Sequence, residues 1–269
     1  MKRKLVSALR YLILSLVSLI SVFPIYWMAV SATNTSAEVT RGRLLPGGQL
    51  AANFKNLLAN QNVAGALWNS LRNAVLVTLL ALIVCSVAGY GFEIFHTKGK
   101  DRLMSLLLLA MMIPFAATMI PLFQMFSKAN LLSSLPAVVL PTIATPFLIM
   151  MFRQSARSFP HEIIEAARID GLGEIQIFSR MFIPTMKSTY AAAMTVTFMS
   201  AWNNYLWPRV ILLDTTKQTM PMLVANLTSG YVTDYGALML AVLITTIPTV
   251  IIFFLLQRHF AEGIVGAVK

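Results

Sequence analysis

Residues 153–187 read RQSARSFPHEIIEAARIDGLGEIQIFSRMFIPTMK, and they separate two long apolar runs of the chain. This segment carries nine charged side chains. At about 2.5 kcal/mol or more per charge, placing it at the centre of a membrane would cost over about 20 kcal/mol. The segment therefore lies in water, whereas its apolar flanks need a different solvent.

The apolar pattern of the flanks repeats along the whole chain. Of the 269 residues, 57% are apolar and 12% are charged, whereas an average soluble domain is about 25% charged. A membrane-spanning helix needs about 20 mostly apolar residues. Six runs without Lys, Arg, Asp or Glu meet this need: 11–37, 73–92, 103–127, 129–152, 188–208 and 235–257. The sequence thus predicts an all-α integral membrane protein.

We expect a single transmembrane domain over residues 1–269, with six transmembrane helices. Segment 154–186 forms a cytoplasmic loop and residues 258–269 form a cytoplasmic tail. Residues 33–68 should be turn-rich with little helix, and the polar uncharged stretches 56–71 and 218–233 should be extracytoplasmic loops. The expected spans cover approximately residues 11–32, 70–93, 103–126, 135–153, 187–207 and 236–257.

The distribution of basic residues predicts the orientation. The net charge of +11 would suggest nucleic-acid binding in a soluble protein, but here the basic residues fall between the apolar runs. With the N-terminus inside, fourteen of the 21 Lys and Arg residues lie on the inner side. Basic residues favour the cytoplasmic side, so both termini are expected there. Arg41, Arg43 and Lys55 in the first outer loop run against this trend.

Within segment 153–187 the residues at its turns predict two short helices. Ser158 is suited to cap a helix at its N-terminus, Pro160 to its first turn and Glu162 to its positive end. Gly171 stands where a left-handed residue commonly ends a helix. We therefore expect a helix over residues 159–170, a bend, and a second helix around 174–182.

The first of these helices has one face with small residues. Ile163, Ala166, Ala167 and Asp170 share that face by their helical spacing. Alanine lets another surface approach closely, and an isolated helix of this length is marginal in water. A docking element is the natural reading, and a loop that merely packs on its own bundle is the alternative.

The same residues resemble the EAA loop of ABC-importer permeases. Glu165-Ala166-Ala167, then Gly171, and finally Met181-Phe-Ile183-Pro184 keep the spacing of that motif, with Met181 and Ile183 as conservative departures. The resemblance covers nearly the whole chain and implies the type I importer permease (MetI-like) fold with a coupling helix. It assigns polar contacts with the ATPase to Glu165 and Asp170, close packing to Ala166 and Ala167, and the bend to Gly171.

The resemblance also implies the location and the partners. They are the bacterial inner membrane, a second homologous permease, a dimer of ATPase subunits that binds ATP and Mg, and an extracytoplasmic solute-binding protein. Membrane lipid surrounds the chain, and no nucleic acid is involved. This chain itself would hold no cofactor and would not be an enzyme.

Motifs for catalysis are missing from the sequence, in keeping with that expectation. The only Gly-Lys pair, Gly99-Lys100, is followed by Asp101 and lacks the P-loop pattern. His161-Glu162-Ile-Ile-Glu165 lacks the second histidine of a zinc protease helix. No metal site is therefore expected. The single cysteine, Cys85, allows no internal disulfide.

The end of the fifth apolar run bears on the substrate. Its residues Trp202-Asn203-Asn204-Tyr205 resemble the corresponding segment in the carbohydrate-importer branch of these permeases. The C-terminal residues 257–269 resemble the tail of the second permease of maltose-type importers. Asn203, Asn204 and Tyr205 become candidates for the substrate pathway. Interhelical hydrogen bonding with an interfacial aromatic belt is the alternative. A polyol or a glycerol phosphodiester stays open as a substrate.

A carrier or channel driven by ion gradients is the main alternative function. Such proteins usually place ionisable residues in their spans, and the six apolar runs contain no Asp, Glu, Lys or Arg. Glu93, which ends the second run, is read either as a proton-relay acid or as a solvated carboxylate. A membrane-embedded enzyme lacks any visible cluster of nucleophile and base.

Overall fold

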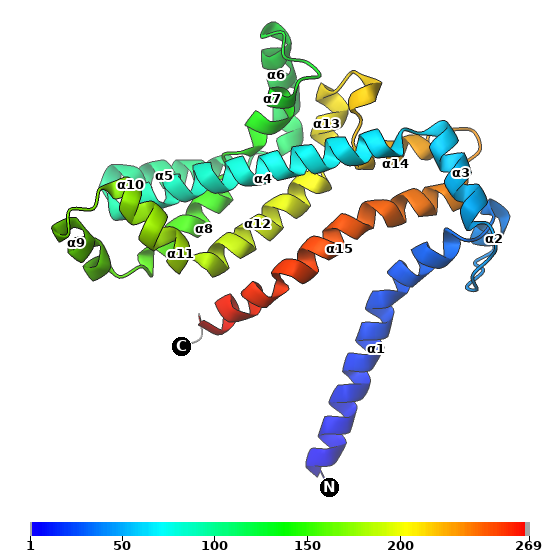
Figure 1. The fold of residues 1–269 in the computed structure, drawn as a ribbon, viewed down its shortest axis with the longest axis horizontal. Helices are drawn as coiled ribbons and strands as arrows, with labels where there is room; N and C mark the ends of the chain where they lie inside the picture. The colour runs from blue at the N-terminus through cyan, green and yellow to red at the C-terminus, as the bar shows by residue number, and fades with distance from the viewer. Residues whose placement is uncertain (1, 267–269) are drawn as a thin grey trace. The chain divides into compact units, whose positions relative to one another are not determined.

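The computed structural model describes residues 2–266, all of whose regular elements are helical (Figure 1). The remaining C-terminal residues of the expected tail, 267–269, lie outside the described residues. The helices are α1 (Lys2–Ser31), α2 (Ser36–Thr40), α3 (Leu50–Asn60), α4 (Val63–Ile94), α5 (Lys98–Ala110), α6 (Phe115–Lys128), α7 (Leu135–Val139), α8 (Pro146–Arg157), α9 (His161–Ile169), α10 (Glu174–Ile177), α11 (Ile183–Thr185), α12 (Lys187–Trp202), α13 (Leu206–Ile211), α14 (Met220–Leu227) and α15 (Tyr235–Gly266). Short helical turns of other types cover η1 (Leu140–Thr142), η2 (Phe178–Phe182) and η3 (Thr215–Lys217).

Three helices within residues 2–266 contain a segment that is long and apolar enough to cross a membrane. These segments are Leu9–Ser31, Val63–Ile94 and Tyr235–Leu255. Two bent helix pairs bring the number to as many as five. The all-helical fold is as predicted. The number of helices that are long and apolar enough to span a membrane, however, stays below the expected six in the described residues.

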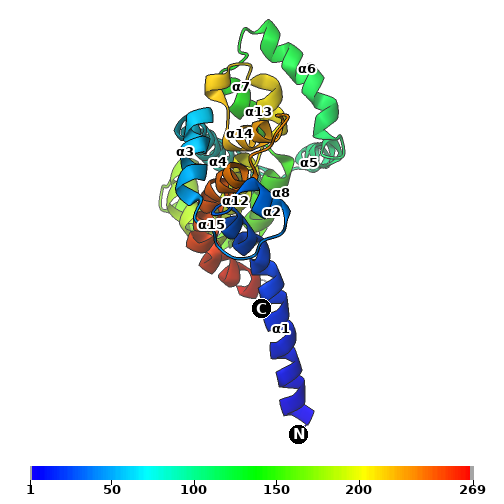
Figure 2. The same ribbon diagram turned by 90° about the vertical axis from the view of Figure 1, so that its right-hand side faces the viewer.

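The bent pairs stand where proline interrupts an expected span. Helices α5 and α6 meet at 99° across a break at residues 111–114, and Figure 2 shows α6 leaving the direction of α5. Pro114 has no N–H to donate and disfavours a helical residue before it. The pair formed by Leu135–Thr142 and α8 bends by 48° ahead of Pro146. The third and fourth expected spans are therefore broken helices.

The fifth expected span, 187–207, is also shorter than predicted. Helix α12 ends at Trp202 after 16 residues, a length of about 24 Å, compared with a hydrocarbon layer of about 30 Å. The Asn203 side chain donates to the Met199 carbonyl at 2.9 Å, a local bond that competes with helix continuation. A new helix, α13, starts at Leu206.

The chain forms two compact units, the first of Met1–Ala64 with Met220–Pro248. In this unit the Asn53 amide donates to the carbonyls of Ala32 and Asn34, both at 2.9 Å. A Cβ at Gly236 would lie only 2.5 Å from that amide, so glycine permits the close packing. Residues 33–68, expected to hold little helix, instead contain α2, α3 and the start of α4, and 218–233 contains α14.

The second unit, Gly65–Thr219 with Thr249–Lys269, holds the larger part of the core. Residues of α4, α5, α8 and α12 pack together in it, with Cys85, Phe152 and Ala193 among those fully buried. Helices α4 and α8 touch at Gly89, where a Cβ would lie 2.6 Å from Phe152 Cβ and 2.7 Å from the Arg153 nitrogen. This contact fixes α8, and with it the start of the charged loop.

Candidate functional site

Helix α9 is the first element of the charged loop. The predicted helix over 159–170 is present from His161 to Ile169, but the expected capping role of Ser158 is wrong. The Ser158 hydroxyl donates to the Ser155 carbonyl at 2.7 Å, because α8 continues to Arg157 and Ser158 follows its last turn. Pro160 occupies the N-cap position instead.

Gly171 ends α9 in the left-handed conformation that its position predicts, with φ of +81°. The Leu172 N–H donates to the Ala167 carbonyl at 2.9 Å, and the Gly171 N–H donates to the Arg168 carbonyl at 3.1 Å. This pair of bonds is the Schellman motif. A Cβ at Gly171 would meet no atom within 4 Å, so glycine is required for the backbone conformation alone.

The face predicted to carry both alanines is divided in the structure. Ala167 is 1% exposed and packs with Ile164 in the internal core, whereas Ala166 lies on the surface. The helix turns by about 100° per residue, so Ile164 and Ala167 form the inner face and Ile163, Ala166 and Asp170 the outer one. Close packing by Ala167 is thus inside this chain.

Two isoleucines complete an outer surface that the sequence reading missed. Ile169 and Ile175 are 86% and 83% exposed, on either side of the Gly171 bend. We define the docking surface as these two residues together with the outer face of α9. Exposed apolar side chains close together on a charged loop are typical of a contact site for another protein. The sequence signal that could have identified this surface was the presence of large apolar residues on both sides of the capping glycine.

Charged groups tie the two short helices together beside this surface. The Arg168 guanidinium donates to a Glu174 carboxylate oxygen at 2.8 Å, and this hydrogen bond raises the pKa of Arg168 above its usual value. Glu165 is exposed and makes no hydrogen bond or ion pair within the described part of the chain, although its negative charge acts on the nearby Arg168. Its carboxylate is therefore available to an external partner.

The loop rejoins the bundle through a π-helical turn. Pro184 is exposed and is the second residue after this turn, Phe178–Phe182. Proline has no N–H for the usual bond to the carbonyl four residues earlier, and a π-helical turn absorbs such a local mismatch. Tyr90 of α4 packs its ring against Phe178 and Phe182, with centroids 5.3 and 5.0 Å away. The loop is thus firmly attached to α4.

Glu93 belongs to an ion-pair cluster beside the loop, and this is neither of its two predicted roles. It accepts hydrogen bonds from Arg153 at 3.0 Å and from Arg157 at 3.1 Å. Arg153, only 4% exposed, also pairs with Asp101. The cluster neutralises charge at the ends of α4, α5 and α8.

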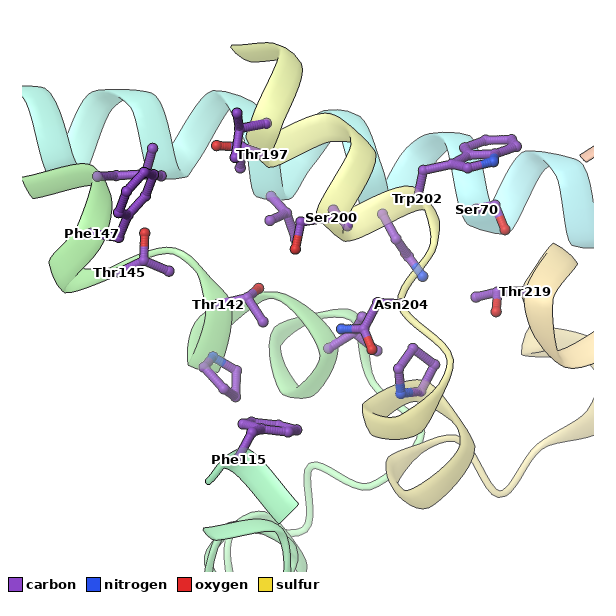
Figure 3. Close-up of a pocket in the computed structure, with 18 of the residues that line it drawn as sticks. Ser70, Phe115, Thr142, Thr145, Phe147, Thr197, Ser200, Trp202, Asn204 and Thr219 are labelled. Carbon is purple, nitrogen blue, oxygen red and sulfur yellow. The ribbon is translucent and has the colours of Figure 1, made fainter. Parts of the chain in front are cut away.

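A cavity of about 340 Å³ lies in the second unit among the broken helices (Figure 3). Its walls come from α4, from the breaks before α6 and α8, and from α12 with the residues that follow it. Asn204 lines this cavity, whereas Asn203 and Tyr205 are not among its lining residues. None of the described residues that line it is charged.

A helical chain with several apolar spans, a charged loop that exposes apolar side chains and an uncharged cavity at helix breaks has the features of the membrane subunit of a transporter. The comparison with known families makes this specific. The chain belongs to the family of binding-protein-dependent transport system inner membrane components, whose model matches residues 87–266.

Relatives cover essentially the full length of the chain. It is 42% identical to the lactose transport system permease protein LacG of Rhizobium radiobacter, covering 100% of this chain and 98% of the relative. The arabinooligosaccharides transport system permease protein AraQ of Halalkalibacterium halodurans is 34% identical, covering 100% of both. The sn-glycerol-3-phosphate permease protein UgpE of Yersinia pestis is 30% identical, covering 93% of both.

A solved structure shares the fold. It is a bacterial ABC transporter involved in the import of the acidic polysaccharide alginate, with a TM-score of 0.83 over 96% of this chain and 97% of that one at 22% identity. The predicted family, permease fold and non-catalytic role are confirmed. The protein is a permease subunit of an ABC importer, and a separate ATPase subunit hydrolyses ATP.

Proposed function

We propose that this permease imports a neutral sugar or oligosaccharide across the bacterial cytoplasmic membrane. The observation that carries the proposal is its full-length similarity to permeases of lactose and arabinooligosaccharide transport systems. A sugar offers many hydroxyl groups and no charge, which suits a cavity lined by threonine, serine, asparagine and aromatic side chains.

The glycerol-phosphate relative makes a phosphorylated substrate the second candidate. Proteins recognise phosphate mainly through arginine, lysine or helix N-termini. No described residue lining the cavity is basic, which favours a neutral substrate. The lack of ionisable lining residues equally disfavours a gradient-driven carrier.

The proposed assembly pairs this chain with a second permease, two ATPase subunits that bind ATP and Mg, and an extracytoplasmic solute-binding protein. Both termini, and the loop 154–186, face the cytoplasm, as the excess of basic residues on that side indicates. The tail 258–269 extends toward the ATPase subunits.

In this arrangement the docking surface is the coupling site for the ATPase. Ile169 and Ile175 enter its apolar cleft, Ala166 allows close approach, and Glu165 and Asp170 make polar contacts at the rim. Gly171 holds the bend between the two short helices, and Pro184 ends the loop at the bundle. Asn204 faces the substrate pathway, with Asn203 and Tyr205 beside it.

Co-purification from the native host tests the coupling site. Ile169→Ser with Ile175→Ser removes the exposed apolar groups without touching the internal core, and we expect the ATPase to be recovered at less than about a tenth of the wild-type amount, as for loss of interface anchors. His161→Ser, at an exposed position of the same loop, is the control. Unchanged ATPase recovery in the double variant would contradict the assignment.

Transport by the purified complex tests the substrate class. Proteoliposomes with the solute-binding protein should accumulate labelled lactose or an arabino-oligosaccharide mixture when ATP is supplied, and should not accumulate glycerol 3-phosphate. Accumulation of glycerol 3-phosphate alone would replace the sugar with the second candidate. Accumulation driven by an ion gradient without ATP would refute the ABC mechanism.

A further inference from the structure

Helix α3 carries a row of apolar side chains that the rest of the chain leaves half exposed. Leu50, Phe54 and Leu58 are four residues apart, so they lie on one side of the helix, and they are 48%, 48% and 49% exposed. Asn53 and Leu57 form the inner side and are buried. An exposed apolar row on an amphipathic helix is typical of a surface that is covered by lipid or by another protein.

The contacts of Asn53 fix the depth of α3 relative to the membrane. The Asn53 amide donates to the Ala32 carbonyl at 2.9 Å, directly after the apolar segment Leu9–Ser31 of α1. The same amide lies against Gly236, the second residue of the apolar segment Tyr235–Leu255 of α15. The middle of α3 is therefore level with the ends of two spans on one side of the membrane, which is the region of the lipid headgroups.

The length and direction of α3 suit a helix that lies on the membrane surface. Its 11 residues make a helix of about 16 Å, which is too short to cross a hydrocarbon layer of about 30 Å. Figure 1 shows α3 running across the direction of the first part of α15, which belongs to the same unit. Both features are expected of an interfacial helix, which lies in the plane of the membrane.

The apolar surface continues from the row on α3 to α1. The Tyr26 hydroxyl donates to the Leu44 carbonyl at 2.6 Å, which holds the segment before α3 beside the last turns of α1. Leu44 and Leu45 expose their side chains there, and very little of the apolar segment of α1 is buried inside the chain. Because the apolar surface passes from a membrane span to α3 without interruption, lipid is the covering that fits both.

The charge on α3 favours phospholipid as well. Lys55 is the only charged residue of the helix and is exposed. Lysine beside the apolar face of a helix is typical of interfacial helices, because the ammonium group is attracted to lipid phosphates. The side of α3 opposite the row carries Asn56 and small alanines, which are compatible with water.

We propose that α3 is an interfacial anchor of this permease. Leu50, Phe54 and Leu58 insert among the acyl chains of the leaflet at that end of α1, and Lys55 lies at the level of the lipid phosphates. In the proposed topology this is the extracytoplasmic leaflet. Because Asn53 joins α3 to the ends of two spans, the anchor holds these ends at a fixed depth. The proposal does not depend on which substrate is imported.

A cysteine scan of the assembled transporter tests the insertion. Each variant is labelled with the fluorophore NBD, and the unsubstituted complex, labelled in the same way, gives the background. All substituted positions are exposed; the row is represented by Leu50→Cys, Phe54→Cys and Leu58→Cys, and the opposite side by the controls Ala52→Cys and Asn56→Cys.

The measured quantity is quenching by brominated acyl chains in vesicles of phosphatidylethanolamine and phosphatidylglycerol. Labels on the row should be quenched at least about twofold more strongly than the two control labels, because only the apolar side of an interfacial helix reaches the acyl chains. Equal quenching on both sides would overturn the proposal. Unquenched labels on the row whose emission changes when the solute-binding protein is added would assign the surface to that protein instead.

Lys55→Glu tests the contact with lipid charge. The substitution should weaken the quenching of the label at position 54 in vesicles that contain phosphatidylglycerol and leave it nearly unchanged in vesicles of phosphatidylcholine, because only the first surface carries a net negative charge. The same quenching as with Lys55 in both vesicles would contradict the placement of Lys55 at the phosphates.

Discussion

At the scale of single residues, the most consequential side chain outside the proposed sites is Arg153. It is almost fully buried and joins Glu93 to Asp101 at the junction between the bundle and the loop. Burying a charge is costly unless a partner compensates it. Each of the three charges therefore depends on the others for compensation. All three residues lie near the expected membrane boundary.

Replacing Arg153 should reveal this dependence. Arg153→Gln leaves the mostly buried Glu93 carboxylate with Arg157 alone, and we expect a loss of about 3 kcal/mol or more in stability. Arg157 also pairs with Glu93 but is 46% exposed, so Arg157→Gln should cost about 1 kcal/mol or less. Melting temperatures of the detergent-purified protein provide the comparison, and equal effects would argue against a buried cluster.

Gly171 offers a second prediction at this scale. Gly171→Ala forces a side chain into the left-handed region at a cost of about 1–2 kcal/mol, although space is open around it. Asparagine tolerates that conformation better, so Gly171→Asn should retain more ATPase on co-purification than Gly171→Ala. Gly99→Ala, in the first turn of α5, is the control, because a Cβ there would make only an ordinary contact with the Thr97 hydroxyl oxygen, at 3.9 Å. Alanine performing as well as asparagine would mean that the bend does not need a left-handed residue.

At the scale of helices, close packing between α4 and α8 depends on one glycine. A Cβ at Gly89 would collide with backbone and side-chain atoms of α8, whereas one at Gly91, two residues further along α4, would meet nothing within 4 Å. Small residues permit such close helix contacts in membranes. The two glycines are thus a matched pair on one helix.

Gly89→Ala should separate α4 from α8 and destabilise the fold by about 1–3 kcal/mol, the usual cost of overpacking. Gly91→Ala should be neutral or slightly stabilising, because alanine favours helix over glycine. Thermal unfolding in detergent measures both. If Gly89→Ala lowers the melting temperature no more than Gly91→Ala does, the contact with α8 does not govern position 89.

At the scale of the whole molecule, the orientation in the membrane can be tested with the protein's single cysteine. Cys85 is buried, so it should react little with a membrane-impermeant thiol reagent. Asn60→Cys should be labelled in intact spheroplasts, and Gly99→Cys only after permeabilisation, because the basic turn around it is predicted to be cytoplasmic. Both parent positions are exposed. The opposite labelling pattern would invert the proposed topology.

The sequence by itself determined the features that depend on local chemistry. Apolar runs without charge predicted an all-helical membrane protein, and the Glu165-Ala166-Ala167 and Gly171 spacing located the charged loop and indicated its family. The left-handed bend at Gly171 follows from a residue type and its neighbours. Such signals need no knowledge of which distant segment lies beside them.

Tertiary structure alone decided what depends on contacts between distant segments. It turned Ala167 inward while leaving Ile169 and Ile175 outside, and it paired Glu93 with Arg153. It also joined Asn53 of α3 to the ends of two spans. The physical reason is that burial and hydrogen-bond satisfaction are set by packing between helices, which the periodicity of a single helix does not specify.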